Sequence, residues 1–222
     1  MIKISIDPQL KKAVPNVALG VVFAPVVVTK DYASLWKEIN KCADKIFSTI
    51  KPDKLYEEVE IRALREAYRA IGKDPSRYRG SAEALVRRIL QGKGLYKVNT
   101  VVDINNLISL ETFRSVGSYN IANLKPPVVF RIGKHGEFYK GISKDVINVA
   151  ELPVFADETG AFGSPTSDSE RAMITMDTKE VMMVIISFSG TQRLLNELTR
   201  TASLLSTYTK SPKERIETLV VE

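Results

Sequence analysis

The segment Val101-Val-Asp-Ile-Asn-Asn106 lies where the pattern of this 222-residue chain changes. It places one acid and two amides on a short, largely apolar stretch. The surrounding residues 99–113 fit a helix, because Val101, Ile104 and Ile108 recur one turn apart. Buried polar groups need hydrogen-bond partners. The polar residues of this segment therefore form either a structural hydrogen-bond network or the wall of a pocket.

Before this segment the chain is mainly helical, and after it the pattern is that of strands. Early strands are expected at 2–6 and about 17–28, and apolar residues at helical spacing predict helices over 31–50, 53–71 and 81–92. Short apolar runs broken by Gly, Pro, Asp and Ser predict strands at 127–132, 137–140, 146–149, 153–156, 172–177 and 181–187, followed by a helix over 191–208.

This order, with no regular strand–helix–strand alternation, predicts an α+β fold in which a helical first part packs on a strand-rich second part. We divide the chain into a strand and helix extension over residues 1–59, a main domain over 60–210 and a C-terminal tail over 211–222.

The charge of the chain is concentrated in one segment. The whole chain carries +6, whereas Arg62 to Lys97 alone holds ten basic and three acidic residues and is therefore +7. Such an excess attracts a polyanion through phosphate contacts. The alternative is that these residues form the solvated faces of two helices.

The usual catalytic devices are scarce. The single histidine, His135, stands in a Gly-Lys-His-Gly turn, and the single cysteine, Cys42, lies close to the apolar stripe of a helix and fits a packing role. No spacing of histidine, cysteine and acids resembles a zinc site, and no glycine pattern is typical of nucleotide binding. We expect no metal and no organic cofactor. One cysteine allows no internal disulfide, and the longest apolar stretch, of 12 residues, is too short to span a bilayer, so we expect a cytoplasmic protein.

Two further polar clusters stand out. The loop 72–80 carries basic residues and one tyrosine, a combination that suits single-stranded or terminal RNA but also occurs in an ordinary turn. The stretch 155–171 is rich in hydroxyls and carboxylates and opens directly from an apolar strand. It reads either as a site held on a rigid scaffold or as a solvated loop.

Taken in order, these segments resemble one family over about residues 60–208. The shared elements are a basic helix with Asp-Pro-Ser-Arg at 74–77, the Ser81 helix, the Val-Val-Asp-Ile-Asn-Asn segment, and the Ala-Asp-Glu-Thr-Gly and Asp-Ser-Glu-Arg stretches that begin at Ala156 and Asp168. Together they are similar to stand-alone proteins related to the tRNA-binding and editing region of the phenylalanyl-tRNA synthetase β subunit.

The resemblance implies a domain that hydrolyses tyrosine wrongly attached to phenylalanine tRNA, with a pocket between the helical and the strand-rich parts. This chain departs from the pattern, because Gly117 and Asn120 stand where the synthetase segment has a histidine and an aspartate. Glu170 falls close to an acid of the synthetase loop. The chain shows no synthetase catalytic core, so we do not expect it to charge tRNA.

We therefore predict trans-editing, the hydrolysis of a mischarged aminoacyl-tRNA. The alternatives are a non-catalytic tRNA- or RNA-binding module, and an enzyme or sensor for an amino-acid-like small molecule that has lost tRNA. The expected partners are tRNA and an amino-acid-like substrate, with no membrane and no DNA. The candidate catalytic residues are Glu170 and Asp168; the candidate substrate-binding residues are Asn99, Asp103, Asn106, Asp157, Glu158, Ser164, Thr166 and Ser167; the candidate tRNA-binding residues are Lys73, Arg77, Tyr78, Arg79, Arg87, Arg88 and Lys93.

Overall fold

Strand β2 (Ala18–Pro25) is buried on both faces and separates two hydrophobic cores. Leu19 and Val21 belong to one core, and Ala18 and Val22, which point the opposite way, belong to the other. A strand covered on both sides needs apolar residues at successive positions rather than alternate ones. This requirement explains the long apolar run seen in the sequence at this point.

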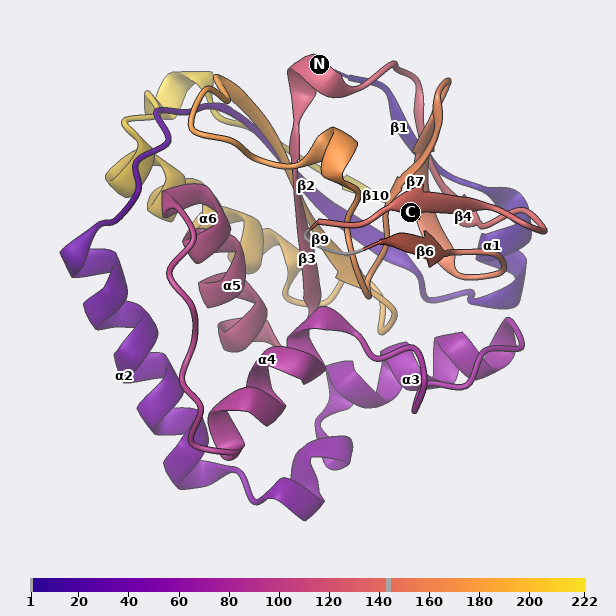
Figure 1. Cartoon of the computed structure of the whole chain (residues 1–222), viewed down its shortest axis with the longest axis horizontal. Helices are drawn as coiled ribbons and strands as arrows, with labels where there is room; N and C mark the ends of the chain where they lie inside the picture. The colour runs from indigo at the N-terminus through magenta and orange to yellow at the C-terminus, as the bar shows by residue number, and fades with distance from the viewer. Residues whose placement is uncertain (1, 143–144) are drawn as a thin grey trace.

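A computed structural model describes residues 2–142 and 145–222 of the chain. β2 belongs to a four-stranded antiparallel sheet with the order β10-β2-β9-β3, which stands at the centre of Figure 1. The other strands of this central sheet are β3 (Ser115–Asn120), β9 (Glu180–Ser187) and β10 (Glu217–Val221).

A second four-stranded sheet packs against one face of the central sheet. Its order is β1-β4-β7-β8; β1 pairs with β4 in parallel, and the other pairs are antiparallel. One core fills the space between the two sheets, with aromatic rings such as Phe130 and Phe155 contributed by the second sheet. The elements on this side are β1 (Ile4–Ile6), α1 (Pro8–Ala13), β4 (Val128–Ile132), β7 (Pro153–Asp157), β8 (Gly160–Gly163) and the small hairpin of β5 (Phe138–Lys140) and β6 (Val146–Asn148).

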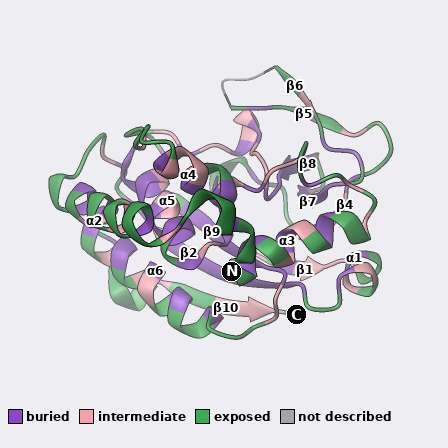
Figure 2. Ribbon diagram, turned by 90° about the horizontal axis from the view of Figure 1, so that it is seen from below, coloured by how far each residue is buried: buried purple, intermediate pink, exposed green. Residues whose placement is uncertain are grey.

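Helices cover the opposite face of the central sheet, so the molecule has three layers: helices, sheet and sheet. The second core lies between this face and the helices α2 (Ala33–Thr49), α5 (Thr100–Thr112) and α6 (Leu194–Thr209). Figure 2 shows α2 and α6 with buried inner and exposed outer surfaces, whereas α5 is buried along most of its length. Two further helices, α3 (Val59–Ala70) and α4 (Ser81–Leu90), follow the 3-10 helix η1 (Pro52–Glu57), and a smaller third core joins η1, α3 and α4 to α2 and α5.

The α+β class and the predicted main helices and early strands are confirmed. The predicted strand at 172–177 is wrong. Residues 170–172 form the short 3-10 helix η3 (Glu170–Ala172), and the next residues turn, with the Thr175 amide donating to the Thr178 hydroxyl at 2.9 Å. The buried Ala172 and Ile174 give the appearance of strand alternation although no neighbouring strand pairs with them.

Four helices and strands were not predicted: α1, the polar strand β3, the strand β8 within the hydroxyl-rich loop, and β10. Residues 217–221, which we assigned to a C-terminal tail, form β10 and pair with β2. The division into domains stays a prediction. None of the helices that the structure describes has the length and the apolar character needed to cross a membrane.

Candidate functional site

A hollow of about 530 Å³ lies between the β5 strand and the segment that follows β8. β5 turns Phe138 and Lys140 outward and Tyr139 inward, as its alternating burial shows. One β-bridge, between Gly141 and Ser169, holds the two segments together. The residues lining the hollow are Phe138, Tyr139, Lys140, Thr159, Ala161, Ser169, Glu170 and Arg171.

Two ion pairs fix the charged groups around the hollow. The Lys140 ammonium lies 2.6 Å from the Glu170 carboxylate, and both side chains are exposed, so each is accessible to a ligand. The Arg171 guanidinium lies 2.9 Å from the Asp157 carboxylate. Burial works against ionisation of Asp157, but hydrogen bonds from Arg171 and from the Lys125 amide outweigh it and lower the pKa of Asp157. Arg171 is therefore held in place in the wall of the hollow by Asp157. Lys140 and Glu170 are the exposed charged residues at the hollow.

One polar atom in the wall of the hollow has no partner. Ser169 is only 2% exposed, and its backbone amide bonds to the Phe162 carbonyl, but its hydroxyl makes no hydrogen bond within the part of the chain that the structure describes. A buried hydroxyl left unpaired costs free energy.

Asp168 stands next to Ser169 in the chain but does not line the hollow. Its carboxylate accepts a hydrogen bond from the Tyr119 hydroxyl at 2.9 Å, and the Tyr139 hydroxyl lies close enough to interact electrostatically. Part of Asp168 remains exposed, yet these rings remove water from its carboxyl group. Desolvation therefore raises the pKa of Asp168 to about 7, although the hydrogen bond from Tyr119 favours ionisation.

The Tyr119 side chain occupies a slot between two glycines. A Cβ atom added to Gly117 would lie 2.2 Å from the Tyr119 hydroxyl oxygen, and one added to Gly163 would lie 2.3 Å from it. The ring is fully buried and meets Phe155 and Phe162 edge-on. Gly117, the position where the resemblance leads us to expect a histidine, is therefore a glycine that makes room for Tyr119.

The predicted substrate-binding hydroxyls of the β8 loop mostly bond within the fold. The Ser164 hydroxyl accepts from the amides of Thr166 and Ser167 and donates to the Ser167 carbonyl. The Thr166 hydroxyl is paired with the hydroxyl of Tyr68 at 2.7 Å, and the Tyr139 hydroxyl donates to the Ser167 carbonyl at 2.6 Å. These contacts give the loop one defined shape, which positions the hollow that follows it.

The predicted residues on α5 have structural partners. Asn99 caps the helix by accepting from the Val102 amide at 3.0 Å, and the buried Asp103 accepts from the Trp36 ring nitrogen at 2.7 Å and from the Val98 amide at 3.1 Å. Asn106 is half-buried, and Glu158 is exposed at the turn after β7. The hollow is lined by residues of β5 and 159–171 and not by residues 99–106. A pocket shared by the candidate substrate-binding residues of 99–106 and of 157–167 is therefore not the hollow described above.

The predicted tRNA-binding residues fall into two groups. Lys73 forms an ion pair with Glu151, and Arg79 forms one with the buried Glu83, so both basic side chains have a structural partner within the chain. Tyr78 is half-buried beneath the Lys73 ammonium. The remaining residues reach solvent or bond to neutral groups: Arg77, Arg87, Arg88 and Lys93.

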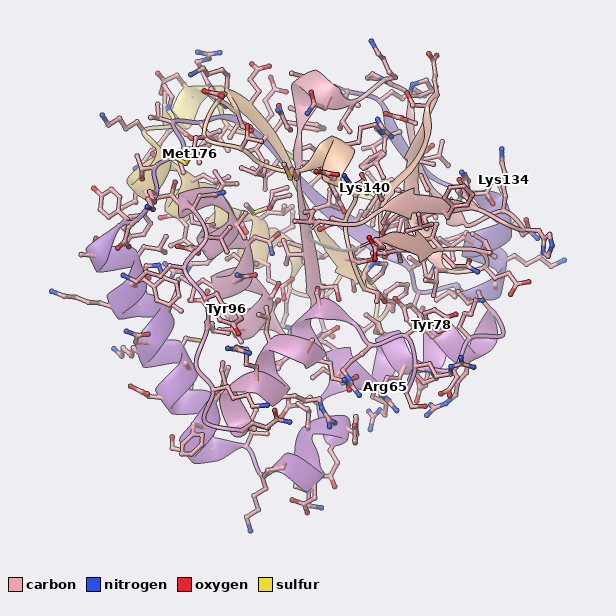
Figure 3. All side chains as sticks on the ribbon, in the orientation of Figure 1. Arg65, Tyr78, Tyr96, Lys134, Lys140 and Met176 are labelled. Atoms are coloured by element: carbon pink, nitrogen blue, oxygen red, sulfur yellow. The ribbon has the colours of Figure 1, made fainter. Side chains whose placement is uncertain are left out.

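His135 lies exposed in the turn between β4 and β5, as predicted. Cys42 is half-buried, and burial raises the pKa of its thiol to about 11, which makes it a poor nucleophile. Among the described residues, no three histidine, cysteine or acidic side chains are grouped so that they could bind a metal ion. Figure 3 shows Lys140 near η3 in the upper half of the view, whereas Arg65, Tyr78 and Tyr96 lie in the lower half.

Sequence reasoning missed four residues of this region: Tyr119, Tyr139, Lys140 and Ser169. Lys140 and Ser169 belong to segments that come together only in the tertiary fold, and no residue spacing in the sequence predicts this contact. Gly117 and Tyr119 could have been found from the sequence. A glycine in a strand often marks a site of close approach, and Tyr119, two residues later on the same face, is the side chain that lies over Gly117.

Comparison with known proteins gives one family match. The model of the B3/4 domain matches residues 63–209, more than half of the chain. The chain therefore belongs to the B3/4 domain family. It is a relative of the phenylalanyl-tRNA synthetase β-subunit domain of that type.

Among solved structures, an N-terminal fragment of the phenylalanyl-tRNA synthetase β subunit from Pyrococcus horikoshii is similar, with 13% sequence identity and a TM-score of 0.48. The match covers 99% of this chain and 50% of the fragment, so the chain spans about half of its length. No curated protein matches by sequence.

Proposed function

We propose that this protein is a trans-editing hydrolase, which cleaves the ester bond of a mischarged aminoacyl-tRNA in the hollow between β5 and η3. The observation that carries this proposal is the combination in one hollow of the Lys140–Glu170 pair and the unpartnered Ser169 hydroxyl. An aminoacyl ester presents an ammonium group and a carbonyl oxygen, and these groups are complementary to a carboxylate on one side and to an ammonium and a hydroxyl on the other. Membership of the B3/4 family supports the choice of substrate.

Because an aminoacyl ester is already activated, the protein needs only to position a water molecule and to stabilise the negative charge that develops on the carbonyl oxygen. The Glu170 carboxylate binds the substrate ammonium or orients the attacking water, and the Ser169 hydroxyl and Lys140 ammonium stabilise the negative charge that develops on the carbonyl oxygen. A hydroxyl of the terminal ribose delivers the proton to the leaving group. Asp168 acts as a positioning residue, because its carboxylate bonds to Tyr119 behind the wall of the hollow.

The test is a deacylation screen with a panel of tRNAs, each charged with a wrong amino acid. We expect hydrolysis of at least one, with Glu170→Gln slower by at least ~10-fold and Ser169→Ala slower as well, at the low end of what positioned acid–base and hydrogen-bonding groups contribute. Glu180→Gln is the matched control, since Glu180 is an exposed glutamate at the start of β9 that pairs with Arg215. A Glu170→Gln variant as fast as wild type would refute the site.

A second candidate function, non-catalytic RNA binding, is favoured by one observation. Gly117 holds the place at which the resemblance leads us to expect a histidine, and Tyr119 fills the adjoining space. Under this alternative the protein binds tRNA but hydrolyses none of the panel. Hydrolysis of free amino-acid esters without tRNA binding would instead support an enzyme for small molecules.

A further inference from the structure

Two tyrosine rings lie against arginine side chains around helix α4. The Arg88 guanidinium carbon lies 3.9 Å from the centre of the Tyr96 ring, and the Arg65 guanidinium carbon lies 4.4 Å from the centre of the Tyr56 ring. Arg87, next to Arg88 on the helix, donates to the Tyr56 hydroxyl at 2.6 Å. The two groups are linked through the adjacent positions of Arg87 and Arg88 on α4, and we call them together the Arg–Tyr surface: Tyr56, Arg65, Arg87, Arg88 and Tyr96.

The rings of this surface are open to solvent. Tyr96 is 69% exposed and Tyr56 is 38% exposed, so each ring has a large area that its arginine does not cover. Tyr78, which the sequence suggested for stacking, is half-buried and offers less area.

The surface is also cationic. Arg88 donates to the carbonyl oxygens of Gly94 and Lys93, and Arg87 donates to a hydroxyl, so these acceptors are neutral, and no acidic side chain among the described residues forms an ion pair with either guanidinium. Arg65 is different, because it pairs with the buried Glu83 and anchors the surface to the fold. The segment from Arg62 to Lys97, which contains most of this surface, carries +7.

The loop that bears Tyr96 is held in place before any ligand arrives. The Arg88 guanidinium bonds to the Gly94 carbonyl at 2.6 Å while its flat face covers the Tyr96 ring. Gly92 and Gly94 adopt positive φ angles, 69° and 59°, which allow the loop to turn back toward the helix. A side chain that is already ordered loses less conformational entropy on binding.

We propose that the Arg–Tyr surface binds unpaired nucleotides of an RNA, with bases stacked on Tyr96 and Tyr56 and phosphates held by Arg87 and Arg88. Protein modules for single-stranded RNA combine aromatic rings and arginine planes for the bases with positive charge for the backbone. In duplex RNA the bases are paired and stacked on each other, so a protein binds it mainly through positive charge that contacts the phosphates. The choice of RNA as the partner rests on the proposed function, and the binding surface is separate from the hollow where the ester would be cleaved.

The test is a fluorescence-anisotropy titration of the full chain with a labelled single-stranded RNA oligonucleotide and with a blunt-ended RNA duplex that has no loop. We expect the single strand to bind more tightly. Tyr96→Ala should weaken its binding by about 5-fold or more, which corresponds to the loss of one base-stacking contact, and Tyr96→Phe should bind like wild type because the ring is retained. Phe47→Ala is the matched control, since Phe47 is a 58% exposed aromatic on the separate helix α2.

Arg88→Ala adds a second readout, because loss of one phosphate contact should reduce the steepness of the salt dependence by about 0.7. Equal binding of wild type and Tyr96→Ala to the single strand overturns the proposal, and so does a blunt-ended duplex that binds as tightly as the single strand. An acidic peptide that binds wild type more tightly than RNA does, and is lost in Tyr96→Ala, would assign the surface to a protein partner instead.

This experiment is independent of catalysis, because the oligonucleotide carries no amino acid. Stacking on Tyr96 with no deacylation by the protein would leave the Arg–Tyr surface standing and refute the hydrolase. Deacylation that depends on Glu170, with no effect of Tyr96→Ala on RNA binding, would refute the surface and leave the hydrolase standing.

Discussion

Replacing Asp168 by asparagine should change how the stability of the protein depends on pH. Desolvation raises the pKa of this carboxyl from its ordinary value of 3.8 to about 7. Between these values the folded state holds a proton that the unfolded state has released, so the contribution of Asp168 to stability is present below pH 3.8 and is lost as the pH rises toward 7. Asparagine does not ionise, and its side-chain oxygen can still accept the hydrogen bond from Tyr119.

The expected change in the free energy of unfolding follows from the same pH interval, between 3.8 and about 7. Each pH unit within it changes the free energy of unfolding by about 1.4 kcal/mol. From pH 5 to pH 7 the wild-type protein should therefore lose up to about 2.7 kcal/mol relative to Asp168→Asn. This figure is a ceiling, because Asp168 keeps some exposure to solvent and water reduces the shift.

The measurement is urea unfolding at several pH values, followed by the fluorescence of the single tryptophan, Trp36, which is buried in the folded protein. Asp177→Asn removes an exposed carboxylate and is the control for the change in net charge. If the difference in unfolding free energy between wild type and Asp168→Asn stays constant from pH 5 to pH 7, the carboxyl is not desolvated in the way we describe.

Three other predictions follow from contacts in the fold. Gly117→Ala should destabilise the protein by about 1–3 kcal/mol through overpacking against Tyr119, and a thermal melt as high as that of wild type would show that the slot is wider than 2.2 Å implies. Arg114→Ala should cost about 3–5 kcal/mol, because it removes the buried cation that pairs with two buried glutamates and leaves them, among the described residues, with the half-exposed Arg193 alone as a cationic partner; chemical unfolding measures this, and a change below ~1 kcal/mol would contradict the assignment. His135→Ala should leave both the thermal stability and any deacylation rate unchanged, since a group exposed in a turn lies outside hydrogen-bond reach of the hollow, and a slower rate in this variant would move the site.

Local pattern predicted the helices well because each has one apolar face that follows its own period. Leu35 and Ile39 on α2 and Leu198 and Leu205 on α6 are buried, as their spacing requires. β3 was missed because its sequence, Ser-Val-Gly-Ser-Tyr-Asn, is polar although every residue of it is buried. The hydroxyls of Ser118 and Tyr119 are satisfied by tertiary contacts, with Asn105 and Asp168 respectively, and a sequence pattern cannot show such contacts.

The candidate site was predicted only in part, for a related reason. Glu170 was singled out and does line a hollow. Asp103 also looked functional, because an acid in an apolar segment is chemically conspicuous; its partner, the ring nitrogen of Trp36, lies far away in the chain. An isolated acid thus has the same appearance in a sequence whether it binds a ligand or a distant side chain.

The position of β2 has a consequence for how this unit could be moved between proteins. The family match begins at residue 63 and ends at residue 209, but β9 is flanked by β2 and β2 by β10, both outside that range. A fragment cut at the limits of the match would leave one side of β9, an eight-residue strand that is almost wholly buried, as a bare apolar edge. Such edges recruit other chains. Any gene fusion that transplants this domain must therefore carry both flanking strands, and we expect the 63–209 fragment alone to aggregate.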